Sequence, residues 1–295
     1  MKYLLSILLA LVFLNFTSSL THQNPPSKKV ALKKLKNEFG FIPSGNVILE
    51  GERLSVQSFY MSQTVVTNRE YQEFLNALKR NGQLEKYEIS KIDSMGWINI
   101  PNMDLQSFAK EYYGNSAYQF YPVVNISKEG AALYCEWYTE QMNKMLPEDK
   151  QMKFRLPLKA EWLRAAEGTK PERIYTWDGS FLRNDKGQFL ANFSRVLNSS
   201  VSRNEEGELI MIKNTLYSPN AKISTDIIAP ADAYWPNEYK LYNLNGNVSE
   251  LLSDSDQVIG GSWYDGGYDI SNRSTKEYKG PSPMVGFRVV ATAIN

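Results

Sequence analysis

The sequence predicts a mixed α/β (α+β) domain over residues 40–295 in which irregular segments outnumber regular ones. In the first half, apolar residues recur at helical spacing behind residues that can cap a helix, with short β-type runs between them. From Tyr175 onward the chain is rich in Gly, Asn, Pro and aromatic residues and has few periodic segments. Loops of this kind must be held by side-chain hydrogen bonds or bound ions. No repeat and no Pro/Ser-rich linker divides the chain after residue 40, which favours one domain.

Composition excludes several functional classes. The chain of 295 residues carries 33 Lys and Arg against 32 Asp and Glu, so it lacks the basic excess of a nucleic-acid-binding module. Apolar residues make up 42%, which is ample for a core. One cysteine (Cys135) and one histidine (His22) argue against a Cys/His zinc site, a Cys–His dyad and an intramolecular disulfide.

The N-terminus has the layout of a secretory signal peptide over residues 1–19. Lys2 is followed by an apolar run from Leu4 to Phe16 and by small residues up to Ser19. The run is shorter than the ~20 residues that span a bilayer, and no cysteine is placed for lipidation. We therefore expect an exported protein, periplasmic or outer-membrane-associated, with no transmembrane anchor after cleavage and no lipid. Residues 20–39 are predicted to be a polar tether ending in a short helix over residues 30–38.

The first half of the domain predicts short strands and a capped helix. Residues 46–49 and 56–61 have the composition of strands. Thr67 and Glu70 form a capping box, and Gly82 ends the helix behind it. Residues 121–126 are predicted to be a buried strand.

Two further helices follow. Ser127 is expected to cap a helix whose apolar stripe includes Cys135, which predicts a buried thiol in preference to a reactive one. A third helix is predicted over residues 158–167, with Trp162 facing inward.

A series of segments, taken in order, resembles the formylglycine-generating-enzyme (sulfatase-modifying factor) family. The segments are residues 61–71, 121–127 and 131–137, Arg155-Leu156-Pro157 with Ala160-Glu161-Trp162, residues 244–250, Gly260-Gly261-Ser262-Trp263, and Gly286-Phe287-Arg288-Val289. The resemblance implies a compact, irregular formylglycine-generating-enzyme fold, distantly similar to C-type lectins. In the oxidase members, two cysteines that follow the Gly-Gly-Ser turn bind copper and oxidise a substrate cysteine.

This chain lacks the two cysteines of the oxidase members. Residues 264–270 contain no cysteine, and carboxylates prefer hard cations to copper(I). We therefore expect no copper and no catalytic residues. The sequence is more similar to cysteine-lacking members from gliding-motility and type IX secretion machinery, notably over residues 175–193. This similarity implies a scaffold or binding subunit whose partners are other envelope or secretion proteins, or further copies of itself.

Calcium is the cofactor that the resemblance implies. In the family, the segment matching residues 243–250 wraps a calcium ion, with Asn243 and Glu250 giving side-chain oxygens and Gly246 and Val248 giving carbonyls. Such an alternation suits calcium. The alternative is a turn held by asparagine side chains, with Glu250 on the surface. Asn192 and Phe193 are candidates for a second site.

Two other functions remain open from the sequence. A divergent oxidoreductase could use a groove formed by Ser262, Trp263, Asp265, Asp269 and Glu277. A lectin-like module stabilised by calcium is the other alternative. The glycines of Gly260-Gly261-Ser262-Trp263 predict a tight turn after a strand in preference to a phosphate cradle.

Overall fold

The computed structural model describes residues 28–100, 103–194, 201–203, 206–207, 209–211 and 227–294. The predicted signal peptide and His22 lie outside this part of the chain. The helices are α1 (Lys28–Glu38), α2 (Asn68–Arg80), α3 (Leu84–Ser90), α4 (Gln106–Glu111), α5 (Lys128–Met145) and α6 (Lys159–Glu167). Short 3-10 turns η1 (Ser94–Asn99), η2 (Ser116–Tyr118), η3 (Glu148–Lys150) and η5 (Gly267–Ile270) lie between them and in the second half.

Two four-stranded sheets organise the domain. The first has the order β1 (Phe39–Ile42), β4 (Phe59–Ser62), β12 (Val290–Ala293) and β5 (Met152–Arg155), all antiparallel. The second has the order β10 (Thr275–Glu277), β9 (Gln257–Ile259), β8 (Ser249–Leu251) and β11 (Val285–Gly286), and its β8–β11 pair is parallel. Hairpins are formed by β2 (Gly45–Leu49) with β3 (Glu52–Val56), and by β6 (Val201–Arg203) with β7 (Leu209–Met211).

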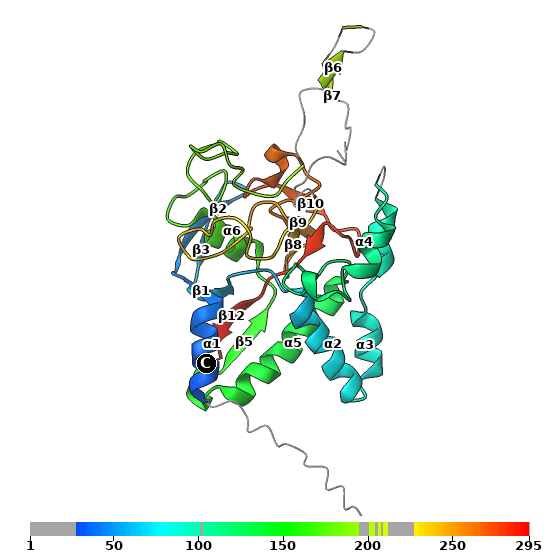
Figure 1. The fold of residues 1–295 in the computed structure, drawn as a ribbon. Helices are drawn as coiled ribbons and strands as arrows, with labels where there is room; N and C mark the ends of the chain where they lie inside the picture. The colour runs from blue at the N-terminus through cyan, green and yellow to red at the C-terminus, as the bar shows by residue number, and fades with distance from the viewer. Residues whose placement is uncertain are drawn as a thin grey trace, which may run out of the picture.

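The first sheet joins the two ends of the chain. β12, near the C-terminus, lies between β4 and β5, so the sheet cannot close until the last strand is in place. α5 runs beside β5, and α2 and α3 pack against α5 (Figure 1). Tyr71, Phe74, Tyr134 and Phe287 form a buried aromatic group between these helices and the sheet.

The predicted helix starts are confirmed. Thr67 and Glu70 make both hydrogen bonds of a capping box at α2, and the Ser127 hydroxyl accepts from the Gly130 N–H at α5. α6 has no capping hydroxyl at Leu158, but the Glu161 carboxylate accepts from the Leu158 N–H at 2.9 Å. No helix among the described residues is long and apolar enough to cross a membrane.

Two strand predictions were wrong. The strand predicted over residues 56–61 is two strands, because β3 ends at Val56 and β4 begins at Phe59. Residues 121–126 are largely buried but form no strand beyond a single bridge from Pro122 to Thr67. Asn125 has a φ of 58°, which takes the chain out of the extended conformation. Periodicity and composition do not reveal a left-handed residue of this kind.

Candidate functional site

The turn that begins at Ser262, next to the segment where the resemblance implies the oxidase cysteines, is held by its own hydrogen bonds. Asp265 Oδ2 accepts from both the N–H and the hydroxyl of Ser262, each at 2.8 Å, and Asp265 Oδ1 pairs with the ammonium of Lys276. Ser262 is fully buried. These three contacts to the Asp265 carboxylate stabilise the turn that follows Gly261. We call the group of Ser262, Asp265 and Lys276 the Ser262–Asp265–Lys276 lock.

The other predicted groove residues do not join this pair. Lys276 points to Asp265, and neighbouring strand residues point to opposite faces, so Glu277 is directed away; it is exposed and lies 3.7 Å from Lys279. Asp269 is also exposed. Trp263 is buried, and its indole N–H donates to the Pro283 carbonyl at 3.1 Å. The structure therefore brings together Ser262 and Asp265, but not the five residues as one catalytic groove.

An open groove lies beside this turn. Its lining includes Leu182, Phe189, Phe193 and Gly267. Phe181 and Tyr268 stand at its edge with 78% and 84% of their surface exposed. Large aromatic side chains this exposed are typical of surfaces that contact another molecule.

Cys135 is a core residue, as predicted. It is 3% exposed on α5, within the same core as Tyr134 and Phe154. Burial raises the pKa of its thiol, so the reactive thiolate is disfavoured. It lies in a different core from the Ser262–Asp265 turn and cannot replace the missing pair.

Glu250 is fully buried in an ion pair with Arg288. The Arg288 Nε donates to both carboxylate oxygens at 3.0 and 2.8 Å, and its Nη2 donates to Oε1 at 2.7 Å. The Trp162 indole N–H adds a 2.8 Å bond to Oε2. Both side chains have 0% exposure.

The remaining Arg288 donors bind backbone carbonyls. Its Nη1 donates to the carbonyls of Ser62 and Gln63, each at 3.1 Å, and its Nη2 to the carbonyl of Tyr242 at 2.8 Å. The guanidinium therefore gathers a carboxylate and three carbonyls, a set of oxygen ligands that a metal cation could otherwise gather.

Glu250, predicted as a calcium ligand or else as a surface residue, is buried and not on the surface. Its oxygens already accept hydrogen bonds from Arg288 and Trp162, a pairing that nothing in its own segment of the sequence indicates. Asn243 fits calcium better, since its Oδ1 is buried and has no hydrogen-bond partner. Gly246 and Val248 are buried in the same segment. Among the described residues, no three His, Cys, Asp or Glu side chains come together as metal ligands, and calcium binding here stays a prediction.

The second candidate site is a junction between loops. The Asn192 amide donates to the Ile227 carbonyl at 2.9 Å and to Asn247 Oδ1 at 3.2 Å. Its carbonyl accepts from the Asn247 N–H. Phe193 packs edge-on against Phe189. The sequence predicts the later ligands of this site beyond an insertion at about residues 198–222, and most of that insertion lies outside the described residues.

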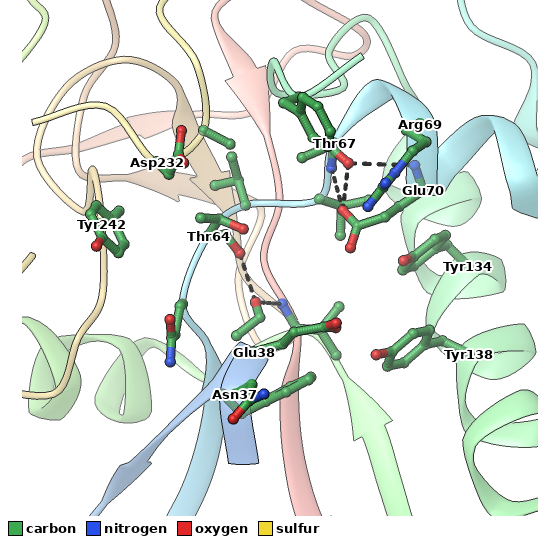
Figure 2. A pocket seen from close by; sticks show the side chains of 18 residues that line it. Asn37, Glu38, Thr64, Thr67, Arg69, Glu70, Tyr134, Tyr138, Asp232 and Tyr242 are labelled. Atoms are coloured by element: carbon green, nitrogen blue, oxygen red, sulfur yellow. Dashed lines mark hydrogen bonds between the residues drawn. The ribbon is translucent and has the colours of Figure 1, made fainter. Parts of the chain in front are cut away.

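A separate cleft of about 350 Å³ opens between β4, α2 and α5. Figure 2 shows the hydroxyls of Tyr134 and Tyr138 pointing from α5 into this space, toward the carboxylates of Glu38 and Glu70. Asp232, from a distant loop, also lines the cleft (Figure 2). Sequence reasoning missed this site because Glu38 was assigned to a tether and the tyrosines to an apolar stripe. The phenolic groups at i and i+4 were the available signal.

Comparison with models of known protein families identifies the family of this chain. The model of the sulfatase-modifying factor enzyme 1-like domain matches residues 33–293. The chain belongs to this family. The match confirms the resemblance drawn from the motif series, and it begins within α1, upstream of the boundary expected at residue 40.

Relatives within the sulfatase-modifying factor family include active and inactive proteins. The chain is 25% identical to the formylglycine-generating enzyme of Bos taurus over 224 residues, which cover 68% of this chain and 50% of that one. It is 25% identical to the Streptomyces coelicolor enzyme over 232 residues (73% and 63%). It is 23% identical over 225 residues (70% and 61%) to a mouse protein named inactive C-alpha-formylglycine-generating enzyme 2. The chain thus spans about half the length of the bovine relative.

Solved structures of the sulfatase-modifying factor fold superpose on most of the domain. CarF has a TM-score of 0.54 at 19% identity, covering 88% of this chain and 98% of its own. PvdO from Pseudomonas aeruginosa has a TM-score of 0.51 at 16% identity, covering 85% and 92%. These likenesses establish the mixed helix-and-sheet fold and carry no information about activity.

Proposed function

We propose that this protein is an exported, non-catalytic member of the sulfatase-modifying factor family that acts as a scaffold or binding subunit in a bacterial envelope assembly of the gliding-motility or type IX secretion type. The observation that carries the proposal is the Ser262–Asp265–Lys276 lock. It occupies the stretch where the oxidase members are expected to hold two cysteines.

The chemistry of this stretch supports a binding role. Oxidation of a thiol by copper needs soft thiolate ligands, and residues 264–270 supply none. Asp265 is satisfied by its own neighbours, which makes it a poor general base for a bound substrate. An inactive relative in mouse is consistent with loss of activity on this fold.

The open groove beside the lock is the surface we assign to a protein partner. Phe181 and Tyr268 offer rigid aromatic area at its edge, and Arg183 lies 3.9 Å from the Phe189 ring centroid. Aromatic and arginine side chains are the residues that most often carry interface energy. The proposed partners are other envelope or secretion proteins, or a second copy of this chain.

Two measurements test the proposed function. The mature protein, supplied with copper and oxygen, is expected to leave a cysteine-containing peptide unchanged; formation of an aldehyde product would overturn the non-catalytic assignment. Affinity purification from native envelope, with and without calcium, is expected to recover secretion components. The Phe181→Ala, Tyr268→Ala double variant should lose them, whereas an exposed control, Glu148→Gln, should keep them. Recovery of the protein alone in every case would count against the scaffold role.

A further inference from the structure

Two tyrosine hydroxyls face the cleft in Figure 2 and make no hydrogen bond to the part of the chain that the structure describes. Tyr134 and Tyr138 are 2% and 8% exposed, and neither hydroxyl makes a hydrogen bond to any described residue. Buried tyrosines elsewhere in the fold are satisfied: Tyr71 donates to the Ser90 carbonyl at 2.9 Å, and Tyr112 to the Pro122 carbonyl at 2.6 Å. The rings of Tyr134 and Tyr138 are buried while their hydroxyls open into the cleft, so both hydroxyls are available to a ligand that enters it.

The charged residues that line the cleft are mostly acidic, which favours a positively charged ligand. Glu38, Glu70 and Asp232 line it, against the single lining cation Arg69, whose guanidinium lies 4.9 Å from the Phe120 ring centroid. Burial raises the pKa of Glu38; the attraction of Lys34 opposes this shift, and the nearby Glu70 adds to it. The cleft therefore holds carboxylates that lack a full set of counter-charges.

One cation of the chain lies close to two residues that line the cleft. The Lys34 ammonium lies 3.7 Å from Glu38 Oε2 and 5.4 Å from the centroid of the Tyr138 ring. A primary ammonium held between a carboxylate and an aromatic face is a recurrent recognition mode for amines. Lys34 belongs to α1 and is not among the residues that line the cleft.

We propose that the cleft binds a primary ammonium group on an aliphatic stem, as found at the end of a lysine side chain. Glu38 and Glu70 supply the opposite charge, and Tyr134 and Tyr138 accept hydrogen bonds from the ammonium. One oxygen of Glu70 is free for this contact, since Thr67 binds only Oε2. The volume of about 350 Å³ suits a side chain or a small amine. The site does not depend on the envelope role proposed above.

Titration calorimetry with defined probes tests this site. Nα-acetyl-lysine methylamide should bind saturably, and its Nε-acetylated form should bind about tenfold more weakly or not at all, because acetylation removes the charge. Butyrate, a carboxylate of similar length, should not bind. Equal binding of the two lysine probes, or tighter binding of butyrate, would overturn the proposal.

Variants assign the binding to this cleft. Glu38→Gln should weaken binding of Nα-acetyl-lysine methylamide at least about fivefold, and Tyr134→Phe with Tyr138→Phe about threefold to tenfold. The tyrosine changes remove only unpartnered hydroxyls, so thermal unfolding should show an intact fold. Glu52→Gln, an exposed carboxylate that does not line the cleft, is the matched control and should bind as the unaltered protein does.

Lys34 distinguishes a cation site from an anion site. Lys34→Gln should tighten binding about twofold to fivefold, since it removes a competing charge; weakening would overturn the proposal. Cadaverine and a lysine-containing heptapeptide separate the two sources of the ammonium. Tighter binding of the peptide assigns a lysine borne by a polypeptide, and equal or tighter binding of cadaverine assigns a free amine.

Discussion

Breaking the buried ion pair between Glu250 and Arg288 is predicted to destabilise the fold strongly. In Glu250→Gln the side chain keeps its shape but loses its charge, which leaves the Arg288 guanidinium fully buried without a counter-ion. Removing one partner of a buried pair typically costs about 3–5 kcal/mol. For a domain of this size, each kcal/mol lowers the melting temperature by about 2–4 °C, so a decrease of about 6–20 °C is expected.

The assay is thermal unfolding followed by circular dichroism, with and without a calcium chelator. If the Glu250 carboxylate pairs with Arg288 and not with calcium, the decrease in melting temperature should be the same with and without chelator. The control is Glu277→Gln, an exposed glutamate in the same sheet, whose effect should stay within about 0.5 kcal/mol. A decrease of under 2 °C in Glu250→Gln, or one that disappears with chelator, would refute the reasoning and favour a calcium ligand.

Other residues give narrower tests. Native Cys135 should resist iodoacetamide at pH 8 and react fully in guanidinium, because burial raises the pKa of its thiol; native labelling would contradict this. Thr67→Ala should lower the free energy of unfolding in urea by about 1 kcal/mol, while Thr67→Ser should restore the cap. Gly246→Ala should destabilise more than Gly187→Ala, since both have φ near 75° but only at Gly246 would a Cβ meet a backbone oxygen, that of Asn192 at 2.3 Å; equal losses would count against this contact.

The sequence predicted the parts of the fold that depend on local chemistry. A capping box depends on two residues that are three positions apart in the sequence. Both of its hydrogen bonds form between Thr67 and Glu70. The inward face of α6 follows from helical spacing, and Trp162 is fully buried as expected. These features need no knowledge of distant residues.

The candidate sites were harder to predict because they depend on pairs far apart in the chain. Glu250 resembles a calcium ligand in its own segment, and only the folded chain shows that Arg288 donates hydrogen bonds to its carboxylate. Glu38, at the end of α1, and Tyr138, in α5, line the same cleft, and the two helices contact each other. No spacing rule places a residue at the end of one helix beside the middle of another.

The carboxylates of this protein fall into two groups, and the difference bears on function. Asp265 forms an ion pair with Lys276, and Glu250 forms one with Arg288. Each carboxylate also accepts hydrogen bonds from neutral donors. Both are fixed where they lie and serve the fold. In the cleft, Glu38 has Lys34 only at its edge, with the ammonium 3.7 Å away, and the nearby tyrosine hydroxyls have no protein partner. Polar groups that face an open cleft and are not paired within the fold are available to a ligand, which is the arrangement typical of small-molecule sites. The cleft, and not the segment of residues 264–270, is therefore where this chain offers carboxylates and hydroxyls to a small charged group.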